Sequence, residues 1–324
     1  MRERSWEEIQ ELICKDDDDK WDVIENVKNL KIDNAGKLVL ANNNSQGPLK
    51  LLPHAFGQMC ARLNIPVRYA KRIPTTLQAQ CINYDLGKFG KYRSRPWLLR
   101  CKGNSVRACL SDTYSVIDNM PILEMVASIC RSFEHRIKQF FMSDLGIWLK
   151  VLVTGLKVKD PSSPSKDLML GLLVGNSEVG TRSVSISPFV CRQRCTNDLV
   201  IQNDKVIKIR HAHKNSTELH EKLSVGMRYA LQSGDNYLDA FASAYHEKIE
   251  RPAETIRKLA EKRGLPQEQT KEIITAYEVE PYPSKFGIIN ALTSTARRKE
   301  GDERIELEKL AGTLLTKPIQ HLAA

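Results

Sequence analysis

The chain has 324 residues, of which 41% are hydrophobic, so it is long enough to fold around one large core or two ordinary ones. Its 49 Lys and Arg against 39 Asp and Glu give a formal net charge of +10, which favours polyanionic partners without distinguishing DNA from RNA or a membrane surface. No apolar run approaches the roughly 20 residues of a membrane-spanning helix, and the first twenty residues lack a signal pattern, so we expect a cytoplasmic protein with no membrane partner. Eight cysteines in mostly apolar surroundings predict free, buried thiols.

Residues 1–48 are predicted to form an acidic arm followed by a hairpin. Four apolar residues recur with the spacing of one face of a short helix: Trp6, Ile9, Leu12 and Ile13. The run Asp16–Asp19 is expected to be solvated, and its charge suggests that the arm competes with nucleic acid for basic surface elsewhere. Strands at 27–32 and 37–40 are predicted to form a hairpin across Asp33-Asn34-Ala35-Gly36.

Residues 49–214 are predicted to form an α+β core. Periodic apolar residues indicate helices at 51–63, 68–72, 77–86 and 121–131, with Pro53 tolerated in the first turn of the first helix. The most distinct hairpin pairs 97–101 with 106–110 around the turn 102–105. Further strands are expected at 147–154, 168–174, 183–190 and 204–210, with a surface loop at 160–165.

Residues 215–324 are predicted to be largely helical and packed on the core. Helical spacing is found at 218–232, 237–247, 252–263, 267–277, 285–298 and 304–315. The fold class we expect is therefore α+β: an antiparallel sheet with packed helices and a largely helical C-terminal part.

Four blocks of sequence carry a resemblance to a known family. They are residues 52–69, 106–119, 175–180 with 195–197 and Arg210-His211, and 289–297. In this order they resemble the DUF932 family of phage and plasmid proteins, a family without an assigned reaction. The resemblance implies a setting of replication or recombination. In size and in its basic hairpin-plus-helix core the chain is also similar to phage single-strand-annealing proteins, which implies assembly into rings or filaments.

The residues expected to contact nucleic acid lie mainly in the segment 87–110. This segment holds seven Lys and Arg and no acidic residue, and Tyr92 and Trp97 are interleaved among the cations. Cations bind phosphates and release counterions, while an aromatic face stacks on unpaired bases. The predicted contacts are Arg93, Arg95, Trp97, Arg100, Lys102 and Arg107, with Arg192, Arg194, Lys208 and Arg210 from a second basic stretch. The alternative is a solvated basic edge strand that its charges protect from aggregation.

No catalytic residue, metal site or cofactor is predicted, because no phosphate-cradling glycine loop, nucleophile elbow or HExxH pair occurs. Two thiols and two imidazoles of the kinds that zinc prefers have a non-standard spacing: Cys191, Cys195, His211 and His213. A metal-dependent nuclease-like site would require Asp112, Asp118 or Glu178 to converge.

The leading hypothesis is ATP-independent binding of single-stranded DNA, or of another nucleic acid, that promotes annealing in recombination or replication, with self-assembly. Two alternatives stay open. One is a divalent-metal-dependent enzyme acting on nucleic acid, and the other is an interaction factor that modulates host defence or replication.

Overall fold

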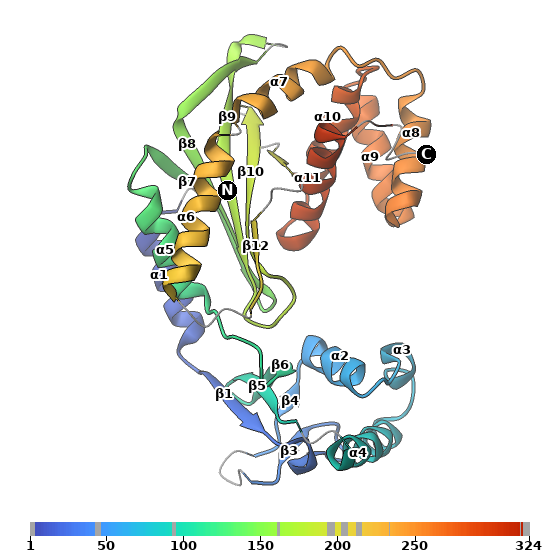
Figure 1. Ribbon diagram of the computed structural model, residues 1–324. Coiled ribbons are helices and arrows are strands. Elements are labelled where there is room, and N and C mark those ends of the chain that lie inside the picture. The colour runs from blue at the N-terminus through green and yellow to red at the C-terminus, as the bar shows by residue number, and fades with distance from the viewer. Residues whose placement is uncertain are drawn as a thin grey trace.

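The structure, a computed structural model, describes residues 4–42, 47–92, 95–160, 163–192, 198–201, 207–211, 216–232, 234–317 and 319. These residues form two lobes, which lie one above the other in Figure 1. We call residues 20–111 the small lobe and the remaining described residues the large lobe. Both lobes combine antiparallel strands with helices, and the helices α8–α11 follow one another in the C-terminal part. The expected α+β class is thus confirmed.

The small lobe is a four-stranded sheet with helices packed against one face. Its elements are β1 (Lys20–Glu25), η1 (Val27–Asn29), β2 (Leu30–Ile32), β3 (Leu38–Leu40), β4 (Lys50–Leu51), α2 (Pro53–Arg62), α3 (Val67–Ala70), α4 (Thr75–Tyr92), β5 (Trp97–Lys102) and β6 (Ser105–Ser111). The order is β1-β5-β6-β4, with β2 and β3 forming a separate hairpin. Met59, Ile82 and Leu99 meet in its core. Gly36 and Gly103 have positive φ at the two hairpin turns, where other residues would be strained.

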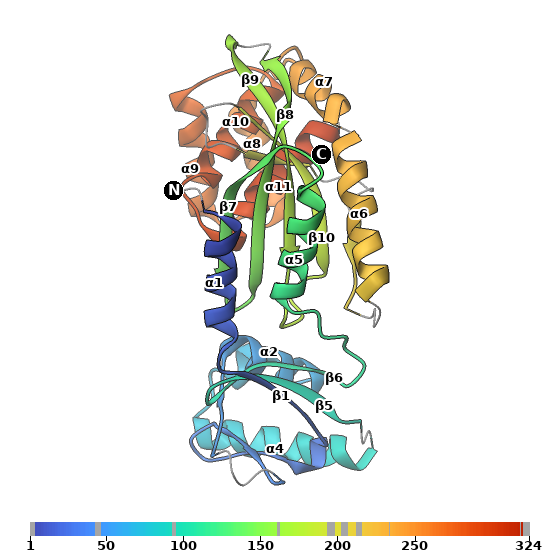
Figure 2. The same ribbon diagram turned by 90° about the vertical axis from the view of Figure 1, so that its left-hand side faces the viewer.

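The large lobe is a six-stranded sheet between two layers of helices. Its strands are β7 (His135–Ser143), β8 (Gly146–Asp160), β9 (Ser163–Asn176), β10 (Val184–Arg192), β11 (Asp198–Val200) and β12 (Ile207–Ile209). Its helices are α1 (Trp6–Asp17), α5 (Asn119–Cys130), α6 (Ser216–Gln232), α7 (Gly234–Ala244), α8 (Pro252–Arg263), α9 (Gln267–Val279), α10 (Lys285–Ala296) and α11 (Gly301–Thr316). Figure 2 shows α1, α5 and α6 across one face. On the other face, Ile305 of α11 packs with Trp148 and Phe189 of the sheet.

Several expected elements differ from those observed. The predicted N-terminal segment does not end at residue 48, because β1 pairs with β5 and so belongs to the same sheet as the hairpin 97–110. The helix expected from the spacing of Trp6, Ile9, Leu12 and Ile13 is present as α1 and is docked, with Ile9 and Ile13 fully buried against α5. The expected loop at 160–165 is instead a tight strand connection in which Asp160 pairs with Ser163, and residues 161–162 lie outside the described part.

Two general expectations concern thiols and membranes. All seven described cysteines are free; five are buried, whereas Cys14 is exposed and Cys81 is half-buried. Within the described ranges, none of the helices combines the length and apolar composition that a membrane-spanning helix needs.

Candidate functional site

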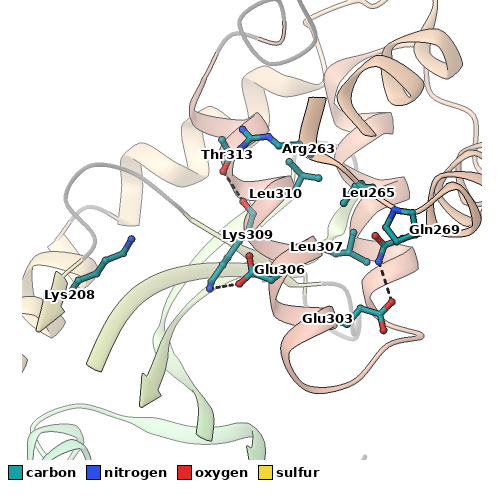
Figure 3. A pocket seen from close by; sticks show the side chains of 11 residues that line it. Lys208, Arg263, Leu265, Gln269, Glu303, Glu306, Leu307, Lys309, Leu310 and Thr313 are labelled. Carbon is teal, nitrogen blue, oxygen red and sulfur yellow. Dashed lines mark hydrogen bonds and ion pairs between the residues drawn. The ribbon is translucent and has the colours of Figure 1, made fainter. Parts of the chain in front are cut away.

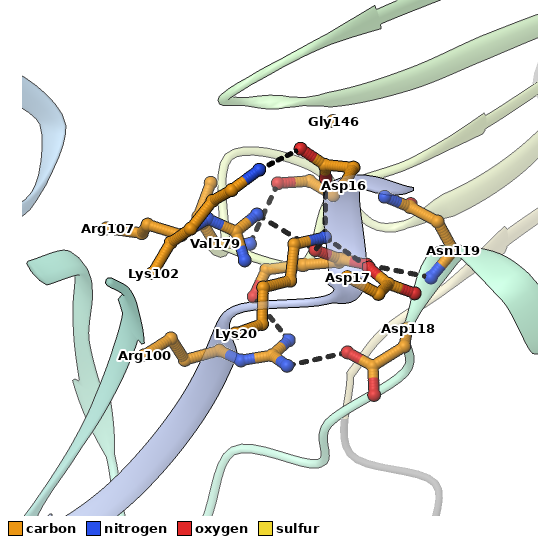
Figure 4. A network of polar contacts seen from close by, with 12 residues as sticks. Asp16, Asp17, Lys20, Arg100, Lys102, Arg107, Asp118, Asn119, Gly146 and Val179 are labelled. Atoms are coloured by element: carbon orange, nitrogen blue, oxygen red, sulfur yellow. Dashed lines mark hydrogen bonds and ion pairs between the residues drawn. The ribbon is translucent and has the colours of Figure 1, made fainter. Parts of the chain in front are cut away.

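The two lobes meet at a buried cluster of charges centred on Glu178. Figure 4 shows its neighbours Lys20, Arg107 and Asn119. Glu178 lies in the turn that follows β9 and is 1% exposed. Its Oε2 accepts hydrogen bonds from Lys20 Nζ and Arg107 Nη2, both at 2.8 Å, and its Oε1 accepts one from the backbone N–H of Asn119 at 3.0 Å. Asn119 begins α5, so the carboxylate also lies at the positive end of that helix. A residue of the large lobe thus binds two cations of the small lobe.

Arg100 makes a second connection between the lobes. Its guanidinium donates to Asp22 at 3.0 Å, to Asp118 at 2.6 Å and to the carbonyl oxygen of Glu178 at 3.0 Å. The acidic end of α1 makes a third, because Asp16 bonds both Lys102 and Lys20 at 2.6 Å. We call these residues the junction network: Asp16, Asp17, Lys20, Asp22, Arg100, Lys102, Arg107, Asp118, Asn119 and Glu178.

The positive and negative charges of the junction network compensate one another. Burial alone would raise the pKa of Glu178, but Lys20 and Arg107 outweigh it and hold that pKa below its ordinary value. Burial would likewise lower the pKa of Lys20, but Glu178 and the Asp16–Asp17 carboxylates raise it. Each described charge at the junction therefore has an opposite charge beside it, and none of these carboxylates is a free base.

The metal-enzyme alternative gains no support from this arrangement. Asp118 and Glu178 do approach the same region, yet each carboxylate is bound to an arginine. In the part of the chain that the structure describes, one group of carboxylate oxygens lies close enough to hold an ion, those of Asp16, Asp17 and Glu178. The ammonium of Lys20 binds all three, so it occupies the place that a metal ion would take.

The zinc-like pattern also fails to form one cluster among the described residues. Cys191 packs in the apolar layer of β10. His211 instead stacks on Tyr114, with ring centroids 4.9 Å apart, and its Nδ1 lies 2.8 Å from the tyrosine hydroxyl. Burial lowers the pKa of His211 and so favours the neutral imidazole. Cys195 and His213 lie outside the described residues.

The hairpin residues that we expected to bind nucleic acid are mostly enclosed. Trp97 is 1% exposed and packs in the small-lobe core, with the Arg62 guanidinium 5.6 Å from its ring centroid. Arg100 and Arg107 are 4% and 6% exposed, and Lys102 pairs with Asp16. The expectation assumed one wet face on this hairpin, but the large lobe covers that face, where Val179 packs on hairpin apolar residues. In this structure Trp97 is not accessible to a base.

The other predicted contacts divide into two groups. Arg95, Lys208 and Arg210 are exposed. Arg192 ends β10, but its side chain is outside the described part, as are Arg93 and Arg194 altogether. The two basic stretches therefore do not form one continuous track among the described side chains.

The positive charge of the chain is concentrated in the small lobe. Residues 20–111 hold 16 Lys and Arg against 4 Asp and Glu, a net charge of +12, so the rest of the chain carries −2. Four of these cations belong to the junction network. Nine others are exposed: Lys28, Lys31, Lys37, Lys50, Arg68, Lys71, Arg72, Lys88 and Arg95. We call these nine, with the exposed rings of Tyr69 and Tyr84, the outer basic surface.

Packing joins parts of the outer basic surface. The side chain of Asn83 on α4 exchanges hydrogen bonds with the backbone of Ile32, which brings the β2–β3 hairpin against α4. Gln78 on α4 donates to the carbonyl oxygen of Ala70 at 2.9 Å, which holds α3 beside the start of α4. A count of charge along the sequence could have found most of this surface, because residues 49–111 hold 12 Lys and Arg against one acidic residue.

A groove on the large lobe is a competing surface (Figure 3). It has a volume of about 720 Å³ and lies between β12, α11 and the α8–α9 turn. Its walls carry Lys208, Arg263 and Lys309 but also Glu303 and Glu306, and Lys309 is paired with Glu306 at 2.8 Å. This mixture of charges makes the groove a poorer site for a polyanion than the outer basic surface.

A search of family models, of curated proteins and of solved structures finds no match to the chain. The resemblance to the DUF932 family therefore rests on the four sequence blocks alone, and the similarity to annealing proteins rests on size and on the basic hairpin-plus-helix core. Residues from the first three of these blocks meet around the junction: Gln58 donates to the carbonyl oxygen of Val179, and Arg107 binds Glu178.

Proposed function

We propose that the protein binds nucleic acid without ATP, that its ligand is single-stranded DNA, and that the small lobe holds the phosphate backbone in annealing or strand protection during recombination or replication. The observation that carries this proposal is the partition of charge: the small lobe carries +12 and the remainder −2. The cations that face the large lobe are neutralised there, and the outer basic surface keeps nine exposed cations.

Such a surface binds a polyanion by counterion release. Each phosphate of a single strand that is neutralised adds about −0.7 to the slope of log affinity against log salt concentration. About six contacts would therefore give a slope near −4. Binding of this kind reads no sequence, which fits a factor that must act on any strand.

Fluorescence anisotropy with a labelled oligothymidine at several salt concentrations tests the proposal. The variant Arg68→Ala/Lys71→Ala/Arg72→Ala removes three exposed cations of the outer basic surface. It should weaken binding by more than tenfold at low salt and reduce the slope by about 2.

The matched control removes the same charge from the large lobe. Arg257, Lys258 and Lys262 are exposed on α8, and their triple alanine variant should bind within about threefold of the wild type. Equal losses in the two variants would mean that only net charge matters and would contradict the assignment to the small lobe. If the wild type does not bind the strand at low salt, nucleic-acid binding is contradicted, and an acidic protein becomes the favoured partner of this surface.

Annealing additionally requires many copies on one strand, so the proposal includes self-assembly. Light scattering with and without oligonucleotide tests this part, and a monomer in both conditions would contradict annealing while leaving strand binding intact.

A further inference from the structure

Two tyrosine side chains of the small lobe are exposed to solvent. Tyr84 on α4 is 65% exposed, and Tyr69 on α3 is 44% exposed. Neither belongs to a hydrophobic cluster of the described chain. Neither hydroxyl makes a hydrogen bond within the described ranges. Exposed aromatic rings beside cations are the combination with which single-strand-binding surfaces stack on bases and hold phosphates.

The surroundings of both rings are cationic. Lys88 follows Tyr84 by one helical turn, and its Nζ lies 4.3 Å from the ring centroid. This cation covers part of the ring and positions a charge beside it, while the exposed remainder stays open to a ligand. Tyr69 stands between Arg68 and the exposed pair Lys71 and Arg72.

We propose that Tyr69 and Tyr84 stack on unpaired bases, so that the outer basic surface selects a single strand over a duplex. The inference rests on the proposed function and adds the side chains that distinguish a single strand from a duplex. In a duplex the base faces are covered by neighbouring base pairs and the phosphates alone are accessible. In a single strand a base can turn onto an exposed ring while the adjacent phosphate meets Lys88 or Arg68. The tyrosines thus take the role that the enclosed Trp97 does not fill.

The expected effect is large enough to measure. Removing one stacking ring lowers affinity for a single strand by roughly 5- to 150-fold. Because stacking uses the ring and not the hydroxyl, phenylalanine should replace tyrosine without loss. Both positions are exposed, so neither substitution should disturb folding.

Three ligands and two variants test the inference in the full chain. The ligands are a labelled oligothymidine, an abasic strand of the same length and a duplex of the same length. Tyr69→Leu/Tyr84→Leu should bind the oligothymidine at least tenfold more weakly than the wild type, and should bind the abasic strand and the duplex as the wild type does. Tyr69→Phe/Tyr84→Phe should match the wild type on all three, and thermal melting checks that both variants are folded.

The outcomes separate this inference from the proposed function. If the leucine variant binds the oligothymidine like the wild type, while the Arg68→Ala/Lys71→Ala/Arg72→Ala variant is weakened, stacking is refuted and strand binding stands. An equal loss by the leucine variant on all three ligands would also refute stacking. If the wild type binds none of the ligands, the proposed function itself fails.

Discussion

Replacing Glu178 by glutamine tests whether the junction network holds the lobes together. The change keeps the size of the side chain and an acceptor for the Asn119 N–H, but it removes the negative charge from a position that is 1% exposed. Lys20 would still have Asp16 and Asp17. Arg107 would lose the carboxylate that it binds, and its Nη1 already lacks a hydrogen-bond partner.

The expected loss in the free energy of unfolding follows from the Arg107 charge that the substitution leaves unpaired. Removing one partner of a buried ion pair costs about 3–5 kcal/mol, because the remaining charge stays desolvated. Since Lys20 keeps two carboxylates, the lower end of this range applies, about 3 kcal/mol. For a domain of this order of size each kcal/mol lowers the melting temperature by about 2–4 °C, so a decrease of roughly 6–12 °C is expected.

Differential scanning calorimetry of the wild type, Glu178→Gln and Glu254→Gln measures this effect. Glu254 makes the same kind of ion pairs, with Arg251 and Lys258, but on the exposed surface of α8. Its substitution should leave the melting temperature nearly unchanged, because exposed pairs contribute little. Equal, small decreases in both variants would refute the claim that the Glu178 carboxylate stabilises the junction.

Other substitutions and conditions give distinct outcomes. Trp97→Phe should lower the free energy of unfolding by at least 1 kcal/mol, as expected for a core ring, while single-strand affinity stays unchanged at a temperature where the variant is folded. Unchanged melting together with weaker single-strand binding in anisotropy would instead support the stacking role of Trp97. Because the pKa of Glu178 is held below its ordinary 4.5, its stabilising contribution is complete above that pH and is lost as pH falls through the lowered value. Melting temperatures of the wild type should therefore decrease on acidification below about pH 4.5 more steeply than those of Glu178→Gln. Ile13→Ala on the docked α1 should cost about 2–5 kcal/mol without tightening nucleic-acid binding, whereas tighter binding in anisotropy would favour a competing acidic arm.

The helices were predictable because their signals are local. Periodic apolar residues placed α8–α11 within a few residues of their observed ends, and α8 begins at Pro252 and stops at Gly264, which has a φ of +64°. The two longest strands that the sequence did not reveal, β1 and β7, are both at sheet edges. Edge strands carry polar residues such as Arg136 and Lys138, so the alternation that marks a half-buried strand is weak there.

The site was less predictable because it depends on contacts between distant parts of the chain. Arg107 and Glu178 each stood out in the sequence, but their pairing joins residues from two sheets. The hairpin 97–110 was assigned correctly, yet its accessibility was not, because the large lobe buries the face expected to be wet. Arg100, Lys102 and Arg107, which the sequence singled out for binding, thus lie at positions where the fold uses them for its own ion pairs.

Ultraviolet crosslinking of the full chain to a photoreactive oligothymidine, followed by mass spectrometry of the peptides, tests the central claim most directly. Crosslinks that concentrate in residues 66–92, where α3 and α4 carry Tyr69 and Tyr84, would agree with binding by the outer basic surface. Crosslinks that concentrate instead around Lys208 and α11 would place the strand in the groove of the large lobe and contradict the account.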